Sequence, residues 1–498
     1  MKTTRIAIFL VLACLAGCSK QSSTEITQKE KSMQPLSGFE INQQIHVIMD
    51  KTGKFSWADA DEFLLWSAVI QGDSILTIGY GDTPFSELKS TKLKNQKEQI
   101  ISLASSNEES VNKLKSGQNV TIYDNPILNY IDLKVSNIET IRQLRTTSNI
   151  RYMEPSGYRF FAYEQRLKSS SGCNNSPETI NAADYSIITP NCMVSWTYYK
   201  HNITQAWNYS TGQGITVGLI DTGISDAQNL LGSNFNDGYS SGRTISKYGT
   251  YVDSFWPWVS SPTDGSNDKC GHGTCMGATI ASPRNDDGQP VGIAYNCNLI
   301  AYRGTSDVVL DDYHEQKGVA NALTNLANLS QVKVISMSIG HIISIGVIED
   351  AIKYAYSKDK LIIAAGGTST TFTNWVGVIF PAWMAECVAV TGITDASGYN
   401  ACSVCHKGSK IDFSVIMERD GTSRNSVCLG YTSNTQKYVG GSSVATSTTA
   451  GIAALVWGAH PSWSRSQVLQ KMKESASLYP NRDANFGYGN IDALKAVQ

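Results

Sequence analysis

The feature that most constrains the fold is a series of short apolar runs, rich in β-branched residues, in the second half of the chain. The runs are Ile215–Ile220, Leu299–Tyr302, Val332–Met337, Leu361–Ala365 and Val388–Val390. Continuous apolar runs of this length are typical of strands buried on both faces of a parallel sheet. Helical stretches such as Ile348–Tyr356 lie between them. The alternation predicts an α/β domain with a parallel sheet over residues 200–498.

A smaller unit with a different pattern precedes this domain. Strand patterns occur at Ser74–Gly79, Leu128–Val135 and Ile150–Pro155, and helical patterns occur at Leu93–Leu103 and Ile138–Arg145. This order predicts a small α+β domain of the ferredoxin-like type. We place it at residues 37–165, and we expect residues 166–199 to link it to the α/β domain.

The N-terminus has the parts of a secretory signal peptide. Met1–Arg5 is short and basic, and Ile6–Leu15 is apolar but shorter than the roughly 20 residues that span a membrane. We therefore expect export and removal of residues 1–17. The stretch Leu15–Cys18 resembles a bacterial lipobox, which implies a lipid on Cys18. The alternative is an ordinary signal peptide with a chance cysteine.

The residues after Cys18 predict how the protein is held. Residues 18–36 are rich in Ser, Thr, Gln, Lys and Glu, and they predict a solvated tether. A lipid there would anchor the protein in the outer membrane or at the cell surface. The formal net charge of −2 gives no electrostatic reason to expect nucleic acid as a partner.

The cysteines favour disulfides. Of eleven, Cys14 leaves with the signal peptide and Cys18 would carry the lipid, so nine remain. Export to an oxidising compartment makes pairing plausible, and because nine is odd at least one thiol has no partner in the chain. We expect Cys173 in the linker to pair with Cys192. Further pairs are expected within the group Cys387, Cys402, Cys405 and Cys428.

Three residues suited to nucleophilic catalysis lie at ends of the predicted elements. Ser443 follows small residues and opens an apolar helix, Asp221 ends the first strand, and His272 stands between glycines before another helix. Taken singly, they are better explained as a helix cap, a turn aspartate and a surface histidine. A serine needs an activating base, and ligands of parallel sheets bind at the carboxyl ends of strands. Together the three residues are therefore candidates for one site.

The segments around these residues resemble a known family. Val217–Ile224, Gly271–Thr274 and Gly441–Thr446 are similar to the aspartate, histidine and serine blocks of the subtilisin-like serine proteases, in that family's order. Ser336–Gly340, Phe380–Ala382 and Phe486–Ala493 resemble other landmarks of the same family. The stretch that ends in Ile150–Pro155 resembles the family's inhibitory propeptide. The resemblance covers about residues 200–498, and most of the chain when the propeptide-like unit is included.

The resemblance implies an activity and a mechanism. Ser443 would attack a peptide carbonyl, His272 would accept the hydroxyl proton and pass it to the leaving amine, and Asp221 would orient and stabilise the imidazole. The protein would be an endopeptidase made as a zymogen, with protein or peptide substrates and its own propeptide as partners. Calcium is common in the family, but we assign no ligands to it, and no metal or cofactor is otherwise expected.

The same resemblance implies a substrate cleft. One side would be Ser338, Ile339 and Gly340, and the other would be Ala365 and Gly366. Backbone groups of such edges can pair with an extended peptide. If self-cleavage falls between about residues 160 and 200, the catalytic domain is freed from its anchor unless the propeptide stays bound. We expect a released or loosely held mature form.

The sequence departs from the family at the oxyanion hole, the donors that stabilise the negative oxygen of the transition state. The family usually has an asparagine where this chain has Gly367, which has no side chain to donate. In subtilisin, loss of this donor lowers the rate about 10²–10³-fold. Asn374, Thr368 or the Ser442 hydroxyl are candidate replacements. This departure keeps open a slow or inactive pseudoprotease that acts as a binding module.

Two further alternatives concern chemistry. An esterase could use the same triad. The stretch Cys402–His406 also matches the attachment pattern of c-type haem, although a disulfide loop that happens to precede a histidine explains it better, because no second such motif occurs.

Overall fold

The computed structural model describes residues 34–498, apart from 86–89, 113–119, 165–172, 255–262 and 369–376. The predicted signal peptide at 1–17, Cys18, nearly all of the tether and Asn374 lie outside these residues. The described residues form part of one compact unit that runs from Pro35 to Gln498. No helix in the described ranges is long and apolar enough to cross a membrane.

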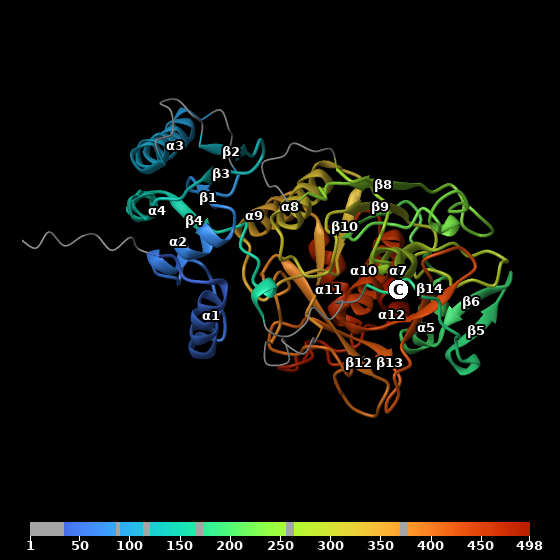
Figure 1. Ribbon diagram of the computed structural model, residues 1–498. Coiled ribbons are helices and arrows are strands. Elements are labelled where there is room, and N and C mark those ends of the chain that lie inside the picture. Colours follow the sequence, from blue (N-terminus) through green and yellow to red (C-terminus); the bar gives the residue numbers. More distant parts are fainter. Residues whose placement is uncertain (1–33, 86–89, 113–119, 165–172, 255–262, 369–376) are drawn as a thin grey trace, which may run out of the picture. The chain divides into compact units, whose positions relative to one another are not determined.

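A seven-stranded, fully parallel sheet forms the centre of the C-terminal domain (Figure 1). Its order is β13-β12-β11-β10-β7-β9-β8. The strands are β7 (Thr216–Asp221), β8 (Ile245–Gly249), β9 (Asn298–Arg303), β10 (Val332–Met337), β11 (Leu361–Ala365), β12 (Cys387–Thr394) and β13 (Phe413–Glu418). All five predicted strands are present within a residue or a few of their expected bounds. The α/β prediction is confirmed.

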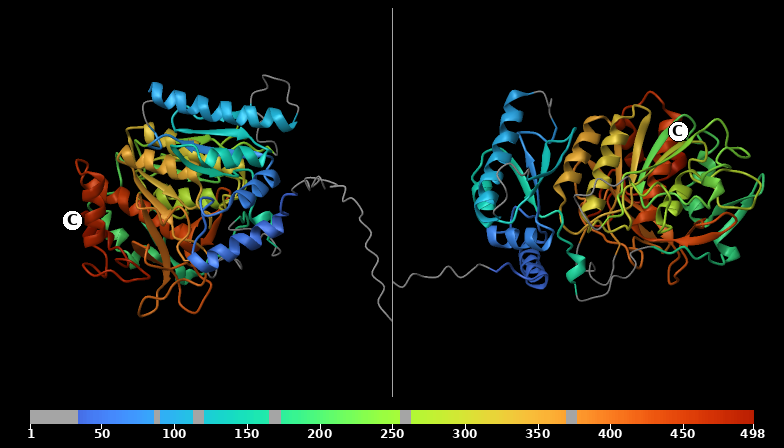
Figure 2. Two further views of the ribbon diagram at one scale, coloured as in Figure 1. Left: turned by 90° about the vertical axis from the view of Figure 1, so that its left-hand side faces the viewer. Right: turned by 45° about the horizontal axis from the view of Figure 1, so that its top comes forward.

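Helices cover both faces of this sheet. On one face, Val217 and Leu219 of β7 share a core with α7 (His272–Ala281), α10 (Gly441–Ala459) and α12 (Ala493–Val497). On the other face, Ile220 packs with α8 (Tyr313–Asn328) and α9 (Gly346–Ser357), which run side by side in Figures 1 and 2. Because apolar side chains point to both faces, the strands read as continuous apolar runs in the sequence.

The N-terminal unit (residues 35–164) is built on a four-stranded antiparallel sheet of order β2-β3-β1-β4. Its elements are α1 (Gly38–Thr52), α2 (Glu62–Gln71), β1 (Ile75–Tyr80), α3 (Thr91–Asn112), β2 (Thr121–Asp124), β3 (Tyr130–Lys134), α4 (Ile138–Arg145) and β4 (Ile150–Glu154). From β1 onward the succession βαββαβ is the predicted ferredoxin-like arrangement. The sequence pattern did not predict α1, α2 or β2.

Smaller elements complete the C-terminal domain. A hairpin of β5 (Tyr185–Ile188) and β6 (Cys192–Ser195) precedes α5 (Trp196–Lys200) and α6 (Ile203–Ala206), and a second hairpin joins β14 (Ser426–Leu429) to β15 (Gln436–Val439). The last long helix is α11 (Arg465–Glu474).

The disulfides differ from those expected. Cys173 is bonded to Cys270, 97 residues away, and Cys402 is bonded to Cys405. The expected Cys173–Cys192 pair is wrong, because the chain at residue 173 lies against the loop before α7 rather than against β6. The second bond falls within the predicted group. The remaining described cysteines are buried thiols: Cys192, Cys275, Cys297, Cys387 and Cys428.

The sheet of the N-terminal unit contacts α8 and α9 through buried charges. Asp132 of β3 is fully buried and accepts hydrogen bonds from the Lys317 ammonium at 2.8 Å and from the Tyr313 hydroxyl at 2.7 Å. Arg151 of β4 forms a two-pronged ion pair with Asp350 of α9, at 2.6 and 2.8 Å. Truncating one partner of such a buried pair leaves an uncompensated charge, so these contacts specify how the two layers fit.

Candidate active site

The carboxyl end of the central strand β7 carries the first candidate residue. Asp221 is the last residue of β7 and is fully buried, and its Oδ1 lies 2.7 Å from Nδ1 of His272. The same oxygen accepts the N–H of Thr222 at 2.8 Å. Because a carboxylate only accepts, Nδ1 of His272 carries the hydrogen, and Nε2 is left with a lone pair when the ring is neutral. This is the tautomer that a general base requires.

The electrostatics favour a proton on His272. Burial lowers the pKa of the imidazole, but the charge of Asp221 and the hydrogen bond to it raise the pKa by more. The net pKa lies above the ordinary value of 6.5. A carboxylate at hydrogen-bond distance therefore makes His272 a stronger base than a free histidine.

Asp268 is a buried carboxylate that the sequence analysis missed, and it shapes the loop before His272. Its Oδ1 accepts the N–H groups of Cys270 and Gly271 and the hydroxyl of Thr222, and its Oδ2 accepts the N–H and hydroxyl of Thr274. The signal was an aspartate placed shortly before a helix start, where its side chain can satisfy unpaired N–H groups. Asp268 thus ties β7, through Thr222, to the start of α7.

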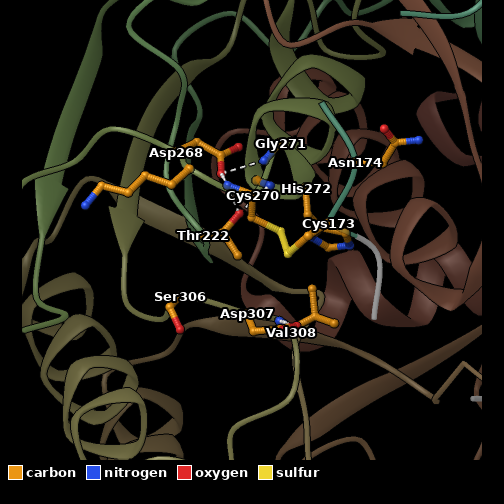
Figure 3. The surroundings of a disulfide bond; sticks show 12 residues. Cys173, Asn174, Thr222, Asp268, Cys270, Gly271, His272, Ser306, Asp307 and Val308 are labelled. Carbon is orange, nitrogen blue, oxygen red and sulfur yellow. Dashed lines mark hydrogen bonds between the residues drawn. A yellow bond between two sulfur atoms is a disulfide. The ribbon is translucent and has the colours of Figure 1, made fainter. Parts of the chain in front are cut away.

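The Cys173–Cys270 disulfide and the segment 173–175 contact the same loop. Figure 3 shows the Cys173–Cys270 bond beside His272, with Asp268 and Thr222 on the far side of the loop. Gly271 has φ of 88°, and a Cβ there would lie 2.2 Å from Oδ1 of Asn175. Only glycine fits this left-handed turn under the 173–175 segment. The position of the imidazole is therefore determined from both sides.

Ser443 faces His272 across one cavity. Ser443 lies in the first turn of α10, and its carbonyl oxygen accepts the hydroxyl of Ser338 at 3.0 Å. Ser443 and His272 both line a cavity of about 400 Å³. The side chains are not hydrogen-bonded to each other among the described contacts. In enzymes without substrate this contact is often long, and it tightens in the complex.

Most of the predicted substrate-binding residues line this cavity. Ser338, Ile339, Gly340 and Ala365 do so, whereas Gly366 does not. The backbone of Gly366 is already engaged, since its N–H donates to Val390 and its carbonyl accepts from Ile379.

The backbone groups of Gly340 were expected to pair with a peptide substrate, but they are already hydrogen-bonded within the chain. Its N–H donates to the carbonyl of Val308 at 2.9 Å, and its carbonyl accepts the N–H of Leu310 at 3.1 Å. Val308 and Val309 also line the cavity. The chain's own segment 308–310 thus occupies the strand-pairing groups of Gly340.

The predicted oxyanion positions are in part described. Gly367 lines the cavity, and its N–H donates to Oγ of Ser442 at 3.2 Å. Thr368 lines the cavity as well. The sulfurs of Cys402 and Cys405 are bonded to each other, so they are not available for haem attachment. No group of three or more His, Cys, Asp or Glu suited to a metal occurs among the described residues, and we assign no calcium ligands.

Comparison with known proteins identifies the family. The sequence profile of the subtilase family matches residues 212–489, which is more than half of the chain. The chain belongs to the subtilase family. It is therefore a serine-type endopeptidase with the subtilisin-like fold.

Individual relatives of this subtilase agree with that assignment. It is 30% identical over 288 residues to alkaline elastase YaB from a Bacillus strain, a match that covers 58% of this chain and 66% of the relative. It is 28% identical over 303 residues to thermitase from Thermoactinomyces vulgaris, covering 60% and 94% of the two chains. Among solved structures, fervidolysin from Fervidobacterium pennivorans, described as a keratinolytic enzyme related to subtilisin, has a TM-score of 0.57 at 16% identity, covering 85% of this chain and 61% of the other. That likeness concerns the fold.

Proposed function

We propose that this subtilase hydrolyses peptide bonds through Asp221, His272 and Ser443, and that the chain is a precursor whose N-terminal unit is an inhibitory propeptide. One observation carries the first part. Asp221 holds His272 at 2.7 Å, and His272 shares a cavity with a serine at a helix N-terminus. Each of the three side chains comes from a different element of the C-terminal domain.

The chemistry follows from this arrangement. Neutral His272 accepts the hydroxyl proton as Ser443 attacks the carbonyl carbon, and an acyl-enzyme forms when His272 returns the proton to the leaving amine. Asp221 keeps Nδ1 protonated and stabilises the imidazolium. Water then attacks the acyl-enzyme with the same histidine as base. The N–H of Ser443, in the first turn of α10, would donate a hydrogen bond to the developing oxyanion.

The segment 308–310 supports the precursor proposal. Its hydrogen bonds to Gly340 occupy groups with which an extended substrate would pair. Glu315 holds the neighbouring residues, since it accepts the hydroxyl of Ser306 and the N–H groups of Asp311 and Asp312. A substrate that pairs with Gly340 must first displace this segment.

The N-terminal unit contacts the same segment. The N–H of Phe161 donates to Oδ2 of Asp311 at 2.9 Å, and Arg159 forms an ion pair with Asp312. These contacts hold residues 311–312 directly after the stretch that occupies Gly340. The unit therefore acts as an inhibitor at least in part by keeping this segment on the cleft.

The location follows from the N-terminal sequence. The signal peptide directs export, and the lipobox-like stretch places a lipid on Cys18, so the precursor is anchored in the outer membrane or at the cell surface. Radiolabelled palmitate incorporated into the chain, and lost in Cys18→Ser, would be the expected result. If the unchanged chain is exported without lipid, the anchor proposal is refuted, whereas the proposed protease activity is not affected by that result.

The decisive test of the triad is labelling by a fluorophosphonate. The purified chain should be labelled on Ser443, and Ser443→Ala should not be labelled. Ser447→Ala is the matched control, because it removes a hydroxyl from the same helix at a residue that does not line the cavity. Absence of labelling, together with no hydrolysis of casein, would favour the pseudoprotease alternative. Hydrolysis of an ester but of no peptide would favour the esterase.

A further inference from the structure

The oxyanion position at Gly367 is closed to any side chain. Gly367 has φ of 123°, and a Cβ there would lie 2.4 Å from Nδ1 of His406 and 2.9 Å from its Cγ. The imidazole ring of His406 thus fills the space into which a residue at 367 would project. The donor lost with the asparagine has to come from another residue.

His406 is not that donor. Its Nδ1 lies 2.9 Å from the carbonyl oxygen of Gly377, so Nδ1 carries the ring hydrogen. Burial lowers the pKa of His406, which keeps the ring neutral and leaves Nε2 as an acceptor only. His406 also does not belong to the residues that line the cavity.

The adjacent residue, Thr368, is tied directly to the start of the nucleophile helix. The N–H of Ser442 donates to Oγ1 of Thr368 at 3.3 Å, and the two hydroxyl oxygens lie 3.1 Å apart. The Ser442 hydroxyl accepts the N–H of Gly367 at 3.2 Å. When Ser442 donates its own hydrogen to Thr368, a chain runs from Gly367 through Ser442 to Thr368. Each bond in such a chain polarises the next.

In this arrangement Thr368 accepts from Ser442, so its own hydroxyl hydrogen points away from Ser442. Thr368 lines the same cavity as Ser443 and His272. Its oxygen also lies against the N–H of Ser442, which precedes the N–H of Ser443 in the first turn of α10. Two donors at one helix end, the Ser443 amide and the Thr368 hydroxyl, can therefore address one oxygen in the cavity.

We propose that Thr368 is a catalytic residue, whose hydroxyl donates a hydrogen bond to the oxyanion in place of the family's asparagine, and that Ser442 positions it. The proposal rests on the proposed triad. It names a different group from the one at the family's usual position, and it requires no side chain at 367.

The test uses the full chain and a chromogenic peptide p-nitroanilide. All variants are processed in trans by tagged, unmodified enzyme that is then removed, so that slow self-processing cannot mimic slow turnover. Thr368→Val keeps the shape and removes the hydroxyl, and Thr368→Ser keeps the hydroxyl. We expect kcat to fall about 10²-fold in Thr368→Val, with KM unchanged within about threefold, and Thr368→Ser to retain most of kcat.

A second measurement isolates the oxyanion. A peptide aldehyde forms a hemiacetal with Ser443 that carries the tetrahedral oxygen, whereas the corresponding peptide alcohol does not. Thr368→Val should weaken binding of the aldehyde by a factor similar to the loss in kcat and leave the affinity for the alcohol unchanged.

Three results would overturn the proposal. In the first, kcat of Thr368→Val stays within about threefold of the unmodified chain. In the second, Thr368→Ser loses as much of kcat as Thr368→Val. In the third, binding of the aldehyde and of the alcohol weakens equally, which would indicate a packing role. If the unmodified chain shows no hydrolysis that depends on Ser443, the triad itself fails, and that outcome is distinct from all three. Thermal melting of each variant identifies any that has not folded.

Discussion

Replacing Glu154 with glutamine should make the full-length chain more stable at alkaline pH and have little effect at acidic pH. Glu154 ends β4 of the N-terminal unit, is 7% exposed, and accepts the N–H of Gly346, the first residue of α9, at 2.8 Å. Burial raises its pKa to about 8, with the nearby charges of Glu349 and Asp350 adding to the rise and the Gly346 hydrogen bond opposing it. The carboxyl therefore keeps its proton where an exposed glutamate has lost it.

The magnitude follows from the two pKa values. The folded chain releases this proton near pH 8 and the unfolded chain near 4.5. Between these values the folded state binds more protons, so the free energy of unfolding decreases as pH rises through the window. At 1.36 kcal/mol per pH unit, the full difference is about 5 kcal/mol. Glutamine keeps an acceptor for Gly346 and cannot ionise, so this part of the pH dependence should disappear.

The assay is urea unfolding of the full chain from pH 5 to pH 8.5, in a Ser443→Ala background that prevents self-cleavage. The quantity of interest is the difference in unfolding free energy between the glutamine variant and its parent, because other titrating groups cancel. It should increase by several kcal/mol toward alkaline pH. A difference that stays constant over this range would refute the reasoning, since Glu154 would then ionise normally in the folded chain.

Three further predictions concern the site. Asp221→Asn should lower kcat/KM about 10⁴-fold in a peptide anilide assay at pH 8, because Nδ1 would no longer be held as the donor; a loss under tenfold would contradict the triad. In the unchanged enzyme, kcat/KM should fall as pH is lowered through the raised pKa of His272, because the base must be neutral, and a flat profile from pH 5 to pH 8 would argue against it. Gly367→Asn should lower the melting temperature without raising kcat, because its Cβ would meet His406 and its φ is left-handed; a faster, equally stable variant would show that the space is available.

Much of the fold could be predicted because it depends on local patterns. The strands β7, β9, β10, β11 and β12 are apolar on both faces, and that requirement is visible residue by residue. Helices α1 and α2 were missed although both are capped, α1 by the Ser37–Glu40 capping box and α2 by Asp61. Aromatic residues and charges mixed through residues 37–75 obscured the periodicity there.

The site was predictable to the extent that it is encoded in contiguous blocks. Asp221 and His272 were chosen as partners, and they lie at hydrogen-bond distance. What could not be predicted depends on contacts between distant segments. Cys173 bonds to Cys270 rather than to Cys192, and segment 308–310 forms hydrogen bonds with Gly340. Neither contact can be predicted from the nearby sequence, because each depends on how distant loops come together at one edge of the sheet.

The Cys173–Cys270 disulfide makes the destination of the mature enzyme depend on which peptide bond is cut. A cut between residues 165 and 172 separates the N-terminal unit, and any lipid it carries, from a catalytic domain that keeps Cys173 as its own new end. A cut a few residues after Cys173 breaks the chain but leaves the two pieces joined through Cys270, next to His272. The first product can diffuse away once the unit dissociates. The second would be a catalytic domain still joined to the N-terminal unit, and to the membrane if that unit carries the proposed lipid, until a reductant opens this one disulfide bond.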